Sequence, residues 1–194
     1  MELVFATQNM NKAREIQKLL PSSVQIKTLA EINCHDDIPE TAKTLAGNAS
    51  LKTAYIVNKF HINCFADDTG LEIDELAGAP GVLSARYAGN QKDSNDNMDL
   101  VLLKLKGISN RQARFRTVIS LVIDGKEQLF EGIAEGEITK EKSGKEGFGY
   151  DPIFKPKGYD ITFSEMTMEE KNRISHRGKA IQKLVHYLAK HFAV

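Results

Sequence analysis

The stretch INCFADDTGLE, residues 62–72, joins an apolar run to two adjacent carboxylates. Residues 62–66 have the composition of a buried β-strand, and Asp67 and Asp68 are predicted to follow at its end. Ligands of open α/β sheets bind at the carboxyl ends of such strands. Because adjacent residues of an extended chain point to opposite faces, we expect the two acids to have different roles.

One of the two acids is expected to face a ligand site, where it would bind a hard cation such as Mg²⁺ or accept a proton from water. The other would accept hydrogen bonds from backbone N–H groups. The alternative is a turn acid that bonds only to its own backbone two residues on. Glu40, in the polar segment IPETAKT, is a candidate second acid.

Strand and helix patterns alternate on both sides of this stretch. Apolar alternation and β-branched runs predict strands at 3–6, 24–28, 115–124 and 127–138. Apolar residues at helical spacing predict helices near 13–20, 44–60, 94–105 and 181–192. Asp124-Gly125 indicates a hairpin, and Thr167-x-x-Glu170 has capping-box spacing. The pattern predicts an α/β fold with a mixed sheet, in a single domain over residues 1–194.

Composition narrows the class of protein. Lys plus Arg and Asp plus Glu each number 26, so the net charge is zero, which disfavours a general nucleic-acid binder. No stretch has the length of a membrane span, and the first residues lack the pattern of a signal peptide. Cys34 and Cys64 form no CxxC motif, so we expect reduced thiols in a cytoplasmic protein.

The segment ATQNMNKAREI, residues 6–16, is read as a strand end, a polar turn and a helix start. The exposed N–H groups of a helix start attract anions, and Lys12 adds a positive charge in the first turn. The segment therefore resembles a phosphate-binding turn built without P-loop glycines. The alternative is a capped helix with a solvated lysine.

The segment EGFGYDPIF, residues 146–154, places Phe148 between two glycines. A ring presented on such a loop suits stacking on a planar base, and the carboxylate of Asp151 would accept hydrogen bonds from ring N–H groups. The alternative is a turn whose ring folds into the core.

The segment EEKNRISHRGKA, residues 169–180, concentrates basic residues. His176 and Arg177 can donate to carbonyl oxygens of a base or to phosphate oxygens. The alternative is a solvated charged face. No Cys or second His stands at ligand spacing from His176, which disfavours zinc.

Taken together and in order, these segments resemble the inosine triphosphate pyrophosphatase family. The resemblance runs nearly end to end and includes ETAKTLAGNASLKTA, residues 40–54, and FADDTGLEIDELAGAPGVLSARYAG, residues 65–89. Members hydrolyse non-canonical purine nucleoside triphosphates such as ITP, dITP and XTP to the monophosphate and pyrophosphate. The resemblance implies an elongated mixed sheet, with helices in two lobes around an active-site cleft, and a homodimer that needs Mg²⁺.

The resemblance also assigns roles to residues of this chain. Asp68 would be the catalytic base and a metal ligand, and Glu40 the other metal ligand. Thr7 to Lys12, Lys52 and Lys171 would hold the triphosphate, Phe148 would stack on the base, and Asp151, His176 and Arg177 would surround its edge. The full set of expected substrate contacts is Thr7, Gln8, Asn9, Met10, Asn11, Lys12, Lys52, Thr69, Phe148, Gly149, Tyr150, Asp151, Lys171, His176 and Arg177.

This assignment agrees with the chemistry of the residues. Triphosphate hydrolysis needs charge neutralisation, an oriented water and a stable leaving group. Donors such as His176 and Arg177 would favour the 6-carbonyl of inosine or xanthosine over the 6-amine of adenosine. Guanine also carries a 6-carbonyl, so its rejection must depend on the 2-position of the purine.

The chain departs in places from the usual family pattern, which around Glu40 reads ETGxTFxEN. Ala42 replaces a glycine, which would reshape the turn if that glycine needed a positive φ. Gly47 replaces a glutamate at capping-box spacing from Thr44, which predicts a helix start weaker by about 0.5–1 kcal/mol. Gln8 stands where glycine is common.

Two other functions compete with this hypothesis. A nucleotide-dependent phosphotransferase would release orthophosphate or a phosphorylated acceptor, but the chain has no GxxxxGK[ST] motif. A non-catalytic purine nucleotide-binding module would not need the acid pair, and both acids are present.

Overall fold

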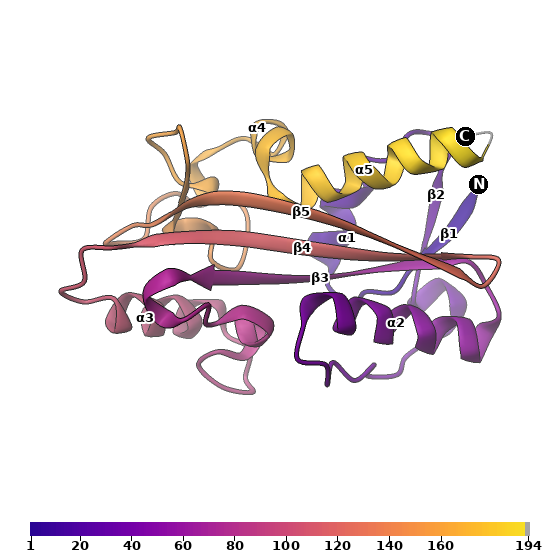
Figure 1. Ribbon diagram of the computed structural model, residues 1–194, viewed down its shortest axis with the longest axis horizontal. Helices are drawn as coiled ribbons and strands as arrows, with labels where there is room; N and C mark the ends of the chain where they lie inside the picture. Colours follow the sequence, from indigo (N-terminus) through magenta and orange to yellow (C-terminus); the bar gives the residue numbers. More distant parts are fainter. Residues whose placement is uncertain (193–194) are drawn as a thin grey trace. The chain divides into compact units, whose positions relative to one another are not determined.

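The computed structural model describes residues 1–192 and has the α/β fold that the pattern predicts (Figure 1). Its strands and α-helices are β1 (Glu2–Phe5), α1 (Met10–Gln17), β2 (Gln25–Thr28), α2 (Leu45–Phe60), β3 (Cys64–Ile73), α3 (Ser94–Lys104), β4 (Gln112–Ile123), β5 (Lys126–Ile138), β6 (Phe154–Pro156), α4 (Met168–Ile174) and α5 (His176–His191). The six strands of the described residues form one sheet in the order β2-β1-β3-β4-β5-β6. Strand β1 pairs in parallel with β2 and β3, whereas β5 pairs antiparallel with β6, so the predicted mixed sheet is confirmed.

The chain divides into two compact units. The first comprises residues 1–68 and 117–132 and the segment from Arg177 onward, and the second comprises residues 69–116 and 133–176. Strands β3, β4 and β5 each contribute residues to both units, because the boundaries fall inside these strands. Asp67 and Asp68 are the last residues of β3 that belong to the first unit.

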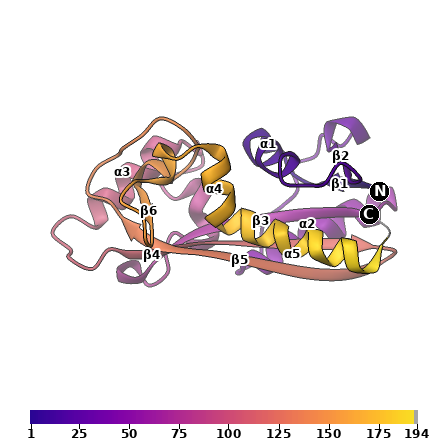
Figure 2. The same cartoon turned by 90° about the horizontal axis from the view of Figure 1, so that it is seen from above.

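In the first unit, both faces of the sheet are buried. Leu3, Phe5 and Phe65 pack on one face with Ile16 of α1 and Ile181 of α5. On the other face, Val4, Ala6, Cys64 and Ala66 pack against Ile56 of α2. Figure 1 shows α5 and α2 on opposite sides of β3, and Figure 2 shows α5 laid along the neighbouring part of β5. Because successive side chains of a strand point to opposite faces, Phe65 of β3 faces α1 and α5, whereas Cys64 and Ala66 face α2.

The second unit has its own aromatic core. Phe154 and Phe163 lie with their ring centres 4.7 and 6.1 Å from that of Phe115. Leu71 and Ile73 of β3 and Met98 and Val101 of α3 belong to the same buried cluster. The part of β3 that belongs to the second unit therefore packs into a hydrophobic core made of residues from that unit.

The predictions that rest on helix caps and tight turns agree with the structure. Asp124 and Gly125 adopt φ angles of 49° and 75°, as the predicted hairpin requires. Thr167 and Glu170 form the predicted capping box at the start of α4. The short strand β6 was not predicted, because its three residues are too few to show a period. No helix within residues 1–192 combines the length and apolarity of a membrane span.

The prediction that a strand ends at the two acids was wrong. Strand β3 continues through Asp67, Asp68 and Thr69 to Ile73. Gly70 lies against the backbone of Gly81, and a Cβ at position 70 would be 2.6 Å from the Gly81 carbonyl oxygen. The extended backbone is retained because neighbouring side chains compensate both carboxylates, as described below.

Candidate active site

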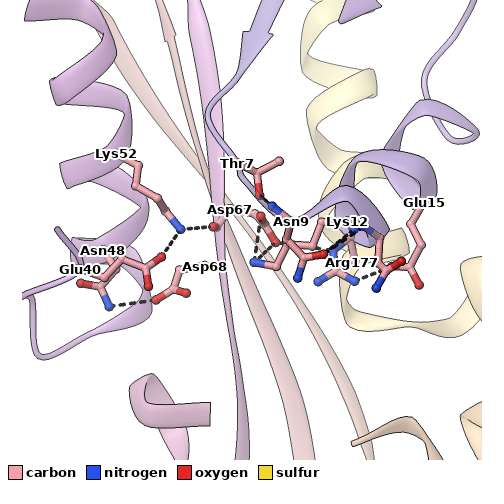
Figure 3. Close-up of polar contacts among 11 residues, drawn as sticks. Thr7, Asn9, Lys12, Glu15, Glu40, Asn48, Lys52, Asp67, Asp68 and Arg177 are labelled. Atoms are coloured by element: carbon pink, nitrogen blue, oxygen red, sulfur yellow. Dashed lines mark hydrogen bonds and ion pairs between the residues drawn. The ribbon is translucent and has the colours of Figure 1, made fainter. Parts of the chain in front are cut away.

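Asp67 and Asp68 point to opposite faces of β3, as strand geometry predicts (Figure 3). The side chain of Asp67 contacts Lys12 of α1 and Arg177 of α5. Asp68 accepts a hydrogen bond from Asn48 of α2. The alternative of turn acids that bond only to their own backbone is therefore wrong.

The Asp67 cluster comprises Lys12, Glu15, Asp67 and Arg177. The Lys12 Nζ lies 3.1 and 3.0 Å from the two carboxylate oxygens of Asp67, and the Arg177 Nε lies 3.5 Å from Oδ2. The Arg177 Nη1 also donates to Glu15 Oε2. Asp67, Glu15 and Arg177 are all buried, so each charge depends on its partners for compensation.

These contacts keep Asp67 ionised. Burial by itself raises the pKa of this carboxyl, but the charges of Lys12, Arg177 and Lys52 hold its pKa well below the ordinary value. Burial also lowers the pKa of Lys12, against the opposing attraction of Asp67. The alternative of a solvated Lys12 is wrong, because its side chain is only 15% exposed.

The turn that presents Lys12 is held by side-chain caps. Asn9 is the N-cap of α1, and its Oδ1 accepts from the N–H groups of Asn11 and Lys12 at 3.0 and 3.3 Å. Thr7 Oγ1 accepts from the Asn9 N–H at 3.1 Å. Gln8 Nε2 donates to the Asp36 carbonyl at 2.9 Å, which connects this turn to the segment between β2 and α2. Thr7 to Asn9 thus form a polar turn without P-loop glycines, and it leads directly into the first turn of α1, which holds Met10 to Lys12.

The Asp68 cluster comprises Glu40, Asn48, Lys52 and Asp68. The Lys52 Nζ donates to Glu40 Oε1 and to the Asp67 carbonyl, both at 2.6 Å. Asn48 Nδ2 donates to Asp68 Oδ2 at 3.0 Å. Burial raises the pKa of Asp68, and the negative charge of Glu40 adds to this rise, whereas Lys52 and Lys12 offset part of it.

In the second unit, Phe148, Asp151 and Lys171 form the Phe148 group. Asp151 Oδ2 accepts from the Phe148 N–H and from Lys171 Nζ, both at 2.8 Å. The Lys171 Nζ also lies 5.0 Å from the centre of the Phe148 ring. Gly147 makes this turn possible, because it has a φ of 79° and a Cβ there would lie 2.2 Å from the same Asp151 oxygen.

Phe148 and the other expected substrate contacts of the second unit differ in exposure. The Phe148 ring is half-buried, neither fully presented nor folded into the core. Tyr150 is buried, and its hydroxyl donates to the Ser84 carbonyl at 2.8 Å. Gly149 adopts a φ of 63°, and Thr69 is a half-buried residue of β3.

The solvated-face interpretation of the basic segment is wrong for its central residues. Lys171, His176 and Arg177 are all buried. The His176 ring stacks on Phe115, with ring centres 4.5 Å apart and planes at 17°. Arg173, paired with Glu169 at helical i, i+4 spacing, lies on the surface, and Lys179 is also exposed.

A family model described as the Ham1 family matches residues 3–187. The chain belongs to the Ham1 family. A Flavobacterium johnsoniae protein named dITP/XTP pyrophosphatase is 56% identical over 188 residues, which are 97% of this chain and 98% of that protein. A Bacillus subtilis protein of the same name is 46% identical over 187 residues, 94% of each chain. These relatives confirm the resemblance that the sequence motifs indicate.

Solved structures of Ham1 proteins confirm the fold. The Staphylococcus aureus Ham1 protein is 37% identical and superposes with a TM-score of 0.90, over 98% of this chain and 99% of that one. A HAM1 protein from Coxiella burnetii is 38% identical with a TM-score of 0.91 at the same coverage. The mixed α/β architecture is therefore that of the Ham1 family.

The Ham1 fold distributes the predicted site residues over both units. The first unit contains Thr7 to Lys12, Glu40, Lys52, Asp68 and Arg177, and the second contains Thr69, Phe148 to Asp151, Lys171 and His176. Two placements were not expected from the sequence. Lys171, predicted to hold phosphate, pairs with Asp151 beside Phe148, and Arg177, predicted to contact the base, pairs within the Asp67 cluster.

Sequence reasoning missed two residues of this Ham1 site. Glu15 is buried against Arg177, and Asn48 is buried against Asp68. A signal existed for each. Glu15 lies one helical turn after Lys12, and Asn48 lies one turn before Lys52, so each shares a helix face with a residue that the motifs single out.

The Asp68 cluster of this Ham1 protein fits a hard divalent cation. Within residues 1–192, no group of three or more His, Cys, Asp or Glu side chains is arranged to hold a metal. Mg²⁺ needs no such cage, since one or two carboxylates and substrate phosphates suffice. Glu40 and Asp68 could offer carboxylate oxygens to such a cation; burial raises the pKa of Asp68 and the charge of Glu40 adds to this rise, a repulsion that a bound cation would relieve.

Proposed function

We propose that this chain hydrolyses the non-canonical purine nucleoside triphosphates dITP, ITP and XTP to the nucleoside monophosphate and pyrophosphate. The observation that carries the proposal is the pair of carboxylates in β3, each held against a buried cationic or amide partner on its own face of the sheet. The relatives named dITP/XTP pyrophosphatase provide the substrate class. Such an enzyme removes these nucleotides from the nucleotide pool.

The reaction is a displacement at the α-phosphorus. Water attacks the α-phosphorus, the bond from that phosphorus to the bridging oxygen of the β-phosphate breaks, and pyrophosphate leaves with the bonding electrons. Asp68 accepts the proton of the attacking water. An ionised carboxylate within reach of the attacking water is suited to this role.

The cations of the first unit neutralise the triphosphate. Lys12 stands in the first turn of α1, whose N-terminal dipole also favours phosphate. Lys52 is held between Glu40 and the β3 backbone. Burial strengthens the interaction of both ammonium groups with a bound anion, because the local dielectric constant is low.

We also propose Mg²⁺ as the cofactor, with Glu40 and Asp68 as the residues that would hold it. When bound, Mg²⁺ neutralises charge on the phosphate oxygens. The support for this proposal is the donor set, two carboxylates of which one is buried and repelled by the other.

We propose that Phe148 stacks on the purine and that neighbouring donors select the 6-carbonyl. Lys171 is the donor that lies beside Phe148 in the second unit. We also propose His176 and Arg177 as donors to the base edge, as the family resemblance implies. The contrast of a carbonyl with an amine at the 6-position is the kind of difference that hydrogen-bonding sites discriminate strongly.

We also propose that the protein is a cytoplasmic homodimer that has no nucleic-acid or membrane partner. The family resemblance supports the homodimer. The two cysteines, which are free and buried, support a reducing compartment.

The test is a product assay with dITP, ITP, XTP, GTP and ATP in turn, in the presence of Mg²⁺. We expect pyrophosphate from dITP, ITP and XTP, and a loss of at least about 100-fold in kcat for Asp68→Asn. The control is Asp160→Asn, which changes an exposed carboxylate outside both clusters. Release of orthophosphate would indicate a phosphotransferase, and nucleotide binding without turnover would indicate a binding module.

A further inference from the structure

Asn48 connects the two segments that carry the carboxylates of the Asp68 cluster. Its Nδ2 donates to Asp68 Oδ2 at 3.0 Å, and its Oδ1 accepts from the Ala42 N–H at 2.9 Å. The side chain is 1% exposed. The amide orientation is determined by its neighbours, because a backbone N–H can only donate and a carboxylate can only accept.

Lys52 repeats this arrangement one helical turn later. Its Nζ donates to Glu40 in the loop and to the Asp67 carbonyl in β3. Asn48 and Lys52 therefore lie on one face of α2, and each bonds both to residues 40–42 and to β3 (Figure 3). Helix α2 thereby sets the position of Glu40 and Asp68 relative to each other.

The two contacts differ in what they control. Lys52 neutralises charge and is itself expected to contact the substrate, whereas Asn48 is neutral and buried. The amide can restrict rotation of the Asp68 carboxylate without adding charge to the site. Hydrogen bonds to a ligating carboxylate are known to orient it and to raise metal affinity.

We propose that Asn48 is a positioning residue that orients Asp68 and couples it to the Glu40 loop, so that the two carboxylates form a divalent-cation site before substrate binds. The proposal rests on the function proposed above, because it assigns these carboxylates to the metal. Asn48 acts through Asp68 and is not itself a catalytic residue.

The experiment measures Mn²⁺ binding to the full-length protein without nucleotide, by water-proton relaxation. Asn48→Leu, which is similar in size, should weaken Mn²⁺ binding about 10-fold, as the loss of an outer-shell partner typically does. Combined with Asp68→Asn, the same change should have an effect of less than about 2-fold, because the oriented carboxylate is already absent. In turnover, the variant should need about 10-fold more Mg²⁺, with an unchanged KM for dITP at saturating Mg²⁺.

Asn97 provides a matched control. It occupies the same position of α3 that Asn48 occupies in α2, the fourth residue after the N-cap, and it is also buried. Its Oδ1 accepts from the Ala88 N–H and its Nδ2 donates to the Ala85 carbonyl, so no carboxylate is involved. Asn97→Leu should destabilise the fold to a similar extent in urea and leave Mn²⁺ binding unchanged.

The proposal is overturned if Asn48→Leu binds Mn²⁺ as the wild type does, or if Asn97→Leu weakens binding equally. It is also overturned if Asn48→Leu has the same effect with and without Asp68, which would indicate general loosening of the fold. Mn²⁺ binding is measured without nucleotide, so failure of the wild type to release pyrophosphate from dITP refutes the proposed function separately.

Discussion

Gly47 and Ala42 make a steric pair whose coupling can be measured. Gly47 is the third residue of α2, and its N–H donates to the Thr44 hydroxyl at 3.0 Å. A Cβ at Gly47 would lie 2.7 Å from the Ala42 Cβ and 3.0 Å from Thr44 Oγ1. Favourable carbon contacts lie at about 3.5–4.0 Å, so a side chain at position 47 requires the Ala42 loop to move.

The expected free energies follow from two opposing effects. Replacing a helical glycine with alanine stabilises by about 0.5–1 kcal/mol, whereas overpacking costs about 1–3 kcal/mol. Gly47→Ala should therefore lower the free energy of unfolding by about 1 kcal/mol. In an Ala42→Gly background the main clash is gone, and the same change should raise it by about 0.5 kcal/mol.

The assay is equilibrium unfolding in urea, followed by far-UV circular dichroism, for the four proteins of the double-mutant cycle. The coupling between the two positions should be about 1.5 kcal/mol, well above the 0.3–0.5 kcal/mol scatter of independent sites. Equal effects of Gly47→Ala in both backgrounds would refute the reasoning. The same pair explains the departures from the family pattern, because Ala42 has no positive φ that would require glycine, and its Cβ occupies the space that a residue at 47 would use.

Two further predictions concern buried groups. Lys171→Met should destabilise the protein in urea by about 3 kcal/mol, because it removes the ammonium from the buried Asp151 carboxylate, whereas Arg173→Met, in an exposed pair, should cost less than about 1 kcal/mol. An equal cost for both would contradict the assigned burial. Burial raises the pKa of the Cys64 thiol to about 12, so iodoacetamide at pH 8 should leave Cys64 unmodified in the native protein and alkylate it in urea, as peptide mass spectrometry would detect. Rapid native alkylation of Cys64 would contradict this.

Much of the fold was predictable because its signals are local. The capping box of α4, the Asp124-Gly125 hairpin and the start of α2 at Thr44 depend on residues at most a few positions apart. The opposite orientation of Asp67 and Asp68 is also local, since it follows from the period of a strand. The family motifs similarly identified both acids, Glu40 and the basic residues as candidates.

The partners of those candidates were not predictable in the same way. Arg177 meets Glu15 across 162 positions of sequence, and Asn48 meets Asp68 across 20. Neither the pairing of Lys171 with Asp151 nor that of Lys12 with Asp67 is encoded in the spacing of the motifs. These contacts depend on which helix covers which face of β3, and on the packing of the second unit around Phe115.

The sequence by itself determined most of the elements, their caps and the opposite orientation of two adjacent acids, because hydrophobic period and capping act over a few residues. Only the tertiary structure decided that β3 continues past these acids to Ile73. A buried carboxylate inside a strand is costly unless a partner compensates it, and the partners, Lys12 and Asn48, arrive from helices on opposite faces of the sheet.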